Sequence, residues 1–273
     1  MDHLAYYHLN QEPFAVMPLT HFYFHSDQHD RALQRLKRVV EGMKGLGVLV
    51  GNVGTGKSLL ARRLLESLSE DEYEVALLVV LHGDVDSNWL VRRIAAQFGV
   101  DVGSGSKVEI IGKLFERLEA IAASGKRAAI LLDEAHMLRG QDLLEELRGL
   151  LNLDLPDRKL LSIVLFGLPE LDDVLMRDPA LQQRTAVRFQ LNPFPPEVVA
   201  EYVRFRIEHA GSDQDIFSDE ALEKIAQYSG GNPRIINVMC DNALFEGFIR
   251  HTRIPLPADV IDSVAEDLRL KKS

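Results

Sequence analysis

Residues 51–58 read Gly-Asn-Val-Gly-Thr-Gly-Lys-Ser and match the pattern G-x-x-x-x-G-K-[ST] at every specified position. Glycines let the backbone wrap an anion with converging N–H groups, and the start of a following helix adds the positive end of its dipole. In this pattern Lys57 pairs with the β- and γ-phosphates, and the Ser58 hydroxyl binds Mg²⁺. We therefore predict a site for ATP and Mg²⁺ that comprises Gly51, Asn52, Val53, Gly54, Thr55, Gly56, Lys57, Ser58 and Leu59.

Two adjacent carboxylates, Asp133 and Glu134, follow an apolar run that reads as a buried strand. Ligands of open parallel sheets bind at the carboxyl ends of the strands. We predict that Asp133 holds Mg²⁺ through water and that Glu134 accepts a proton from the water that attacks the γ-phosphate. The alternative is that both acids only cap a following helix. A base beside the metal ligand favours hydrolysis, so the residues predict an ATPase rather than a kinase.

Residues 133–136 spell DEAH, which also labels a class of helicases. Such helicases need two α/β motor domains, the second with its own arginine-bearing motifs. Residues 193–273 of this chain read as helices only, with no second series of strands. This excludes the helicase interpretation.

Strands that alternate with helices surround these motifs. Helical patterns are predicted at 26–44, 57–68, 86–98, 107–123 and 141–153. Apolar runs predict five strands, at 47–51, 73–81, within 127–136, at 159–167 and at 186–191. Strands and helices in alternation imply an α/β fold whose parallel sheet is covered by helices on both faces.

The strands stop at Pro193, and four helical patterns follow it, within 195–211, 218–231, 232–249 and 257–270. Their starts are marked by capping residues such as Ser218 and by an Asn-Pro pair at 232–233. We predict three parts: an N-terminal segment 1–25, an α/β ATPase domain 26–192 and a small helical lid domain 193–273.

Composition limits the classes of partner and compartment. The 273 residues carry a net charge of −10, which argues against a broad nucleic-acid footprint because phosphate-backbone binding depends on clustered Lys and Arg. The single cysteine, Cys240, excludes an internal disulfide and suits a reducing cytosol. The N-terminus lacks the features of a secretory signal, and the apolar run 75–81 is too short to span a bilayer. The sequence predicts a cytoplasmic chain without a membrane span.

With these motifs in place, the sequence resembles the AAA+ ATPases of the general secretion pathway protein A (ExeA-like) family over nearly its whole length. The resemblance begins with the Tyr-Tyr, Pro-Phe and aromatic-rich opening of residues 6–36. It continues through GNVGTGKS, LLDEAH, LLEELRGLLNLDLP, LFGLPEL, YVRFRIEHAG and GGNPRIINVMCDNAL. The resemblance implies a P-loop AAA+ fold with a five-stranded sheet and a helical lid.

The resemblance also assigns roles to two arginines. Arg234, in the first turn of the helix that Pro233 opens, matches the second sensor, which directs a guanidinium at the nucleotide phosphates. Arg184, just before the predicted fifth strand, matches the arginine that AAA+ proteins present to the nucleotide of a neighbouring subunit. The alternatives are an exposed helix-start arginine for Arg234, and for Arg184 a structural role with Arg177 or Arg188 in its place. Action in trans implies a homo-oligomer.

The sequence departs from the family at Leu168, where a glutamine usually follows the glycine of the fourth strand, so we assign no first sensor. The family implies an assembly or remodelling ATPase that serves an inner-membrane secretion or pilus machine, at the inner face of the bacterial inner membrane. The alternative is a DNA-associated AAA+ regulator of the transposition type. The net charge of −10 favours the envelope role over binding to nucleic acid.

Overall fold

The computed structural model describes residues 3–15, 17, 19–138 and 140–271. Among these residues, no helix combines the length and the apolar character that crossing a membrane requires. Close contacts divide the chain into two compact units. The helical unit comprises Met1–Ser26, Gly54–Gly56 and Asn192–Ser273, and the sheet unit comprises Asp27–Val53 and Lys57–Leu191.

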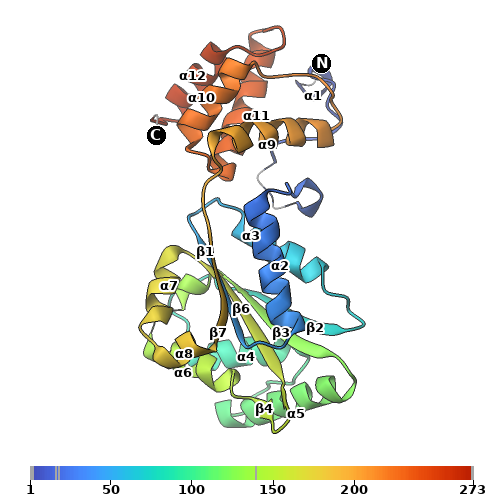
Figure 1. Cartoon of the computed structure of the whole chain (residues 1–273), viewed down its shortest axis with the longest axis vertical. Coiled ribbons are helices and arrows are strands. Elements are labelled where there is room, and N and C mark those ends of the chain that lie inside the picture. The colour runs from blue at the N-terminus through green and yellow to red at the C-terminus, as the bar shows by residue number, and fades with distance from the viewer. Residues whose placement is uncertain (1–2, 16, 18, 139, 272–273) are drawn as a thin grey trace. The chain divides into compact units, whose positions relative to one another are not determined.

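The centre of the sheet unit is a five-stranded sheet in the order β2-β3-β6-β1-β7 (Figure 1). All four neighbouring pairs run parallel. The predicted α/β fold with a five-stranded parallel sheet is therefore confirmed. The strands are β1 (Leu46–Gly51), β2 (Tyr73–Val79), β3 (Arg127–Asp133), β6 (Leu161–Gly167) and β7 (Thr185–Leu191).

The three central strands β3, β6 and β1 are buried on both faces, as is typical of parallel sheets. Successive residues of a strand point to opposite faces, so a strand buried on both sides reads as one apolar run. Val48 and Val50 of β1 belong to a core cluster with helices α4 to α8, whereas Leu49 between them is buried outside that cluster. In β3, Ile130 belongs to the same cluster. The opposite face is covered by α2 and α3, which contact β1 and β6.

The helices of the sheet unit follow the predicted pattern, with additional helical segments after β3 and after β6. Ser106 and Glu109 form a capping box that starts α5 at the predicted residue. A helix that was not predicted begins at Pro169 after β6, although its proline and first-turn acids are typical of a helix start. The helices are α2 (Asp27–Glu41), α3 (Lys57–Glu66), α4 (Ser87–Gln97), α5 (Lys107–Ala123), α6 (Gln141–Leu150), α7 (Pro169–Met176) and α8 (Pro179–Arg184), with a 3₁₀ turn η2 (Ala135–Met137).

A short antiparallel hairpin, β4 (Asp154–Leu155) and β5 (Arg158–Lys159), precedes β6. The predicted strand at 159–167 therefore starts too early, because Lys159 pairs with Asp154 of the hairpin and the sheet strand begins at Leu161. The hairpin has two residues per strand, too few to produce an alternating pattern of apolar and polar residues.

In the helical unit, the four helices after Asn192 share one apolar core. They are α9 (Pro196–His209), α10 (Asp219–Ser229), α11 (Pro233–Ile249) and α12 (Ala258–Asp267). The predicted caps are present: the Ser218 side chain accepts a hydrogen bond from Ala221 N, and the Asn232 side chain accepts one from Arg234 N. The predicted helical C-terminal region is confirmed.

The N-terminal segment, with α1 (His3–Tyr6) and a 3₁₀ turn η1 (Thr20–Phe22), contributes side chains to this helical core. Tyr7, Phe14 and Phe22 are buried in the same cluster as the four helices. The buried Arg206 of α9 donates from Nε to Pro13 O at 2.5 Å, and its guanidinium lies 4.4 Å from the centre of the Phe22 ring. The segment therefore belongs to the helical unit by its contacts, and the division into three domains stays a prediction.

Candidate active site

The predicted phosphate-binding loop connects the carboxyl end of β1 to the first residue of α3. β1 is buried along its whole length between β6 and β7, which fixes where the loop begins. Gly54 and Gly56 have φ angles of +84° and +98°. Residues with a Cβ rarely adopt these angles, so both positions require glycine. Asn52 and Val53 are exposed, and Ser58 and Leu59 lie half-buried in the first turn of α3.

Lys57 is the buried cation of this site, with 6% of its surface exposed. Its Nζ donates hydrogen bonds to Gly51 O at 2.9 Å and to Asn52 O at 3.0 Å. Burial lowers the pKa of the Lys57 ammonium, and the nearby charges of Glu134 and Asp133 raise it. The Lys57 ammonium therefore interacts with the loop carbonyls by hydrogen bonds and with the charges of both predicted acids.

Asp133 is the last residue of β3 and is also buried, with 5% of its surface exposed. Its Oδ1 accepts a hydrogen bond from Glu134 N at 2.9 Å. Glu134 has a left-handed backbone, φ 56° and ψ 33°, and turns the chain from β3 into η2. The Glu134 side chain is 41% exposed. The Asp133 carboxylate is therefore buried, whereas the Glu134 carboxylate is accessible to solvent.

These residues fit a nucleotide with its metal ion. The first turn of α3 offers backbone N–H groups, and the Lys57 ammonium offers a buried positive charge for an anion. Ser58 and Asp133 offer the oxygen ligands that Mg²⁺ prefers. Within the described ranges, no group of three or more His, Cys, Asp or Glu side chains could hold a metal by itself.

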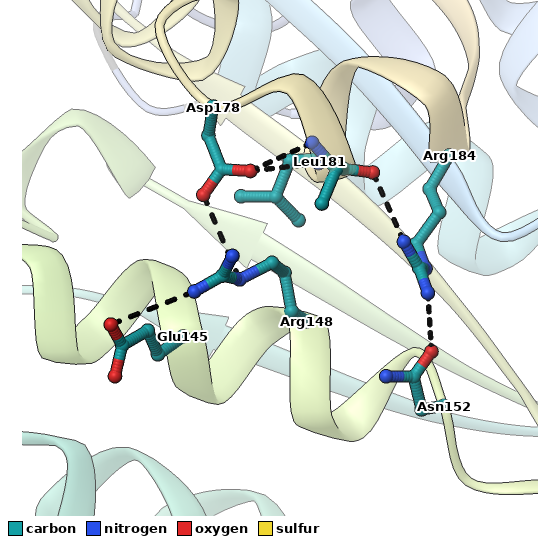
Figure 2. Close-up of polar contacts among 7 residues, drawn as sticks. Glu145, Arg148, Asn152, Asp178, Leu181 and Arg184 are labelled. Atoms are coloured by element: carbon teal, nitrogen blue, oxygen red, sulfur yellow. Dashed lines mark hydrogen bonds and ion pairs between the residues drawn. The ribbon is translucent and has the colours of Figure 1, made fainter.

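Arg184 ends α8 and lies directly before β7 (Figure 2). Its Nη1 donates to Ala180 O at 3.2 Å, and its Nη2 donates to Asn152 Oδ1 at 2.6 Å. β1 and β7 run parallel, with Leu46 opposite Thr185 and Gly51 opposite Leu191. Arg184 is therefore at the amino end of this strand pair and the loop at its carboxyl end, roughly 16–20 Å away at about 3.3 Å per residue.

The short helix α8 that presents Arg184 is itself fixed by polar contacts (Figure 2). Asp178 caps it by accepting hydrogen bonds from Ala180 N and Leu181 N. Asp178 Oδ2 also lies 3.7 Å from Nε of Arg148 in α6. Nη2 of the same arginine lies 3.6 Å from Glu145 Oε1. Two links therefore tie α8 to α6 and its C-terminal turn, one through Arg148 and one through Asn152.

The other two candidate arginines are placed differently. Arg188 on β7 forms an ion pair with Asp172 of α7 at 3.0 Å and is about a quarter exposed. Arg177 follows the last residue of α7 and is exposed.

Arg234 is the second residue of α11 in the helical unit, after the Asn232 cap. Its role as a nucleotide sensor stays a prediction. Leu168 follows β6 and precedes α7, and it caps that helix without a side-chain hydrogen bond. The position of the usual first sensor therefore carries an apolar side chain.

His136 was not among the predicted site residues, although its side chain lies beside that of Glu134. Its Nδ1 is 3.4 Å from Glu134 Oε2, and its side chain is 13% exposed. The available signal was its spacing two residues after the proposed base.

The sequence of this chain matches a known protein family and a curated relative. A model of the AAA domain family matches residues 40–175. General secretion pathway protein A of Aeromonas hydrophila is 35% identical over 260 residues, which cover 93% of this chain and 46% of that protein. The chain therefore spans about half the length of this curated relative.

Solved structures share the fold at low sequence identity. The Aeropyrum pernix ORC1 protein in complex with DNA has a TM-score of 0.68 at 18% identity, covering 94% of this chain and 69% of that one. The Aeropyrum pernix ORC2 protein, in ADPNP-ADP complexes, has a TM-score of 0.67 at 16% identity, covering 90% of this chain and 71% of that one. The solved structures show the shared fold, whereas the family match and the secretion-pathway relative show that the chain belongs to the AAA domain family and is related to general secretion pathway protein A.

Proposed function

We propose that the chain is a Mg²⁺-dependent ATPase that acts as an assembly or remodelling factor in a secretion or pilus-type envelope system. The observation that carries the ATPase part is the buried Lys57 ammonium, held at the end of β1 and electrostatically coupled to Asp133 and Glu134. A buried positive charge at the start of a helix, beside two carboxylates, suits a phosphate with a bound metal ion.

Each residue has a distinct part in the proposed hydrolysis. Lys57 and the N–H groups at the start of α3 bind the β- and γ-phosphates, and Ser58 and Asp133 hold Mg²⁺. When bound, Mg²⁺ neutralises the negative charge that develops on the phosphate oxygens. Glu134 takes a proton from the attacking water. The water oxygen bonds to the γ-phosphorus while the bond to the bridging oxygen breaks, and ADP leaves with that electron pair.

Arg184 completes the site of a neighbouring subunit in this proposal. The roughly 16–20 Å between Arg184 and its own loop, estimated from strand length, exceeds the reach of an arginine side chain. A guanidinium at the phosphate of another subunit accelerates hydrolysis about 10³-fold or more in related nucleotide hydrolases. The active species is therefore a homo-oligomer, in which one chain supplies the loop and the next supplies the arginine.

The envelope role is supported by the relationship to general secretion pathway protein A. The proposed location is the cytoplasm, at the inner face of the inner membrane, with a membrane component of that machine as partner. The DNA-associated alternative would be favoured by salt-dependent DNA binding of the wild-type chain, or by stimulation of its ATPase activity by duplex DNA.

Substitution Lys57→Ala is expected to abolish ATP binding while the fold stays intact, because the only buried cation of the loop is lost. Calorimetric titration with ATP measures the affinity, and circular dichroism checks the fold. Lys37→Ala, which removes a partly exposed lysine of α2, is the matched control and should bind normally. Unchanged ATP affinity in Lys57→Ala would exclude the proposed phosphate site.

Substitution Glu134→Gln is expected to retain MgATP binding and to slow turnover by about a hundredfold or more, within the usual range for loss of a general base. Phosphate release measures turnover, and fluorescence of a labelled ATP analogue measures binding. Glu170→Gln, at an exposed glutamate of α7, should behave as the wild type. Wild-type turnover in Glu134→Gln would assign the base to another residue.

A mixture of Arg184→Ala and Lys57→Ala chains is expected to regain ATPase activity, although each variant alone should be inactive. The mixed interface pairs an intact loop with an intact arginine, so activity should reappear in proportion to mixed oligomers. Steady-state assays and light scattering measure the two quantities. If mixed oligomers form and activity stays absent, Arg184 is structural, and Arg177 or Arg188 becomes the candidate.

A further inference from the structure

The backbone at Glu134 adopts a conformation that a residue with a Cβ avoids. Its φ of 56° and ψ of 33° lie in the left-handed region, where the Cβ approaches the neighbouring carbonyl oxygen. Strain of this kind persists where surrounding structure imposes it, and it is concentrated at functional sites. The left-handed turn at Glu134 leads from β3 directly into η2. In this arrangement the His136 ring lies next to the Glu134 carboxylate.

Contacts on both sides hold η2 in place. Ala135 is fully buried in the core cluster, and Met137 N donates a hydrogen bond to Glu134 O at 2.9 Å. Gly167 ends β6, and a Cβ added there would lie 3.1 Å from His136 N. The His136 backbone therefore packs closely against the end of β6.

The His136 ring meets the Glu134 carboxylate from this fixed backbone. Its Nδ1 lies 3.4 Å from Glu134 Oε2. Nδ1 is buried, and within the part of the chain that the structure describes it makes no hydrogen bond, so its approach to Glu134 Oε2 is a close contact rather than a formed hydrogen bond. The Glu134 carboxylate is 41% exposed, whereas the His136 side chain is only 13% exposed. One carboxylate oxygen therefore faces the buried ring, while part of the same side chain stays open to solvent.

We propose that His136 is a positioning residue for Glu134, an inference that rests on the proposed ATPase function. With a proton on Nδ1, the imidazole holds Oε2 and leaves Oε1 to accept the proton from water. The imidazole itself gives up and takes up no proton during the reaction. A side chain held within a small angular range of the productive geometry raises turnover without changing how tightly substrate binds.

Two substitutions of nearly equal size separate positioning from packing. An asparagine at 136 places an amide N–H close to the position of Nδ1, whereas a leucine fills a similar volume and offers no donor. His136→Leu is expected to lower kcat about tenfold or more, with unchanged MgATP affinity, because orientation of a general base contributes to its catalytic effect. His136→Asn should regain most of the lost kcat. His209→Leu, in the helical unit, is the control for loss of a surface histidine.

A double-mutant cycle tests whether His136 acts through Glu134. In a Glu134→Gln background, adding His136→Leu should reduce turnover by less than twofold, since the group that His136 positions is already gone. Equal effects of His136→Leu in both backgrounds would overturn the proposal. Wild-type kcat in His136→Leu, or a loss of MgATP affinity that accounts for its slower turnover, would overturn it as well.

Other outcomes remain decisive if His136→Leu folds poorly. His136→Gln extends its amide toward the position of Nε2 rather than Nδ1, so its kcat should fall well below that of His136→Asn. Equal kcat values for these two variants would overturn the positioning role. A wild-type oligomer that binds MgATP without hydrolysing it would instead refute the proposed ATPase function, and the positioning role with it.

Discussion

The site depends on one buried positive charge, the Lys57 ammonium at the end of β1. A charge taken out of water is costly unless hydrogen bonds and opposite charges compensate for it. The carbonyls of Gly51 and Asn52 accept its hydrogen bonds, and Asp133 and Glu134 lie near enough to favour its charged form. The parallel sheet satisfies these requirements together, because the carboxyl ends of β1 and β3 lie at the same edge.

Much of this arrangement could be predicted from the sequence because its signals are local. The loop pattern, the central strands buried on both faces and the helix caps at Ser218 and Asn232 each depend on a few neighbouring residues. The hairpin before β6 has strands too short for any periodic pattern. Helix α7 carries the signals of a helix start, a proline at 169 and acids in its first turn, but at eight residues it is too short for a clear helical pattern.

Contacts between distant residues could not be predicted in the same way. The bond between Arg184 and Asn152 joins residues 32 positions apart, and its geometry depends on how α8 packs against the end of α6. The approach of His136 to Glu134 spans two residues only, yet it depends on the left-handed backbone at Glu134 and on the close packing of Gly167. Sequence patterns report residue types and spacing, whereas these contacts depend on backbone direction and on tertiary packing.

A crystal structure with Mg²⁺ and a non-hydrolysable ATP analogue would show whether the Lys57 ammonium binds the phosphates. Lys57 Nζ should lie within hydrogen-bond distance of the β- and γ-phosphate oxygens, with Ser58 Oγ on the metal ion and Asp133 beside it, directly or through water. Binding of the analogue elsewhere, with Nζ keeping only its hydrogen bonds to the carbonyls of Gly51 and Asn52, would show that Lys57 is not the phosphate ligand.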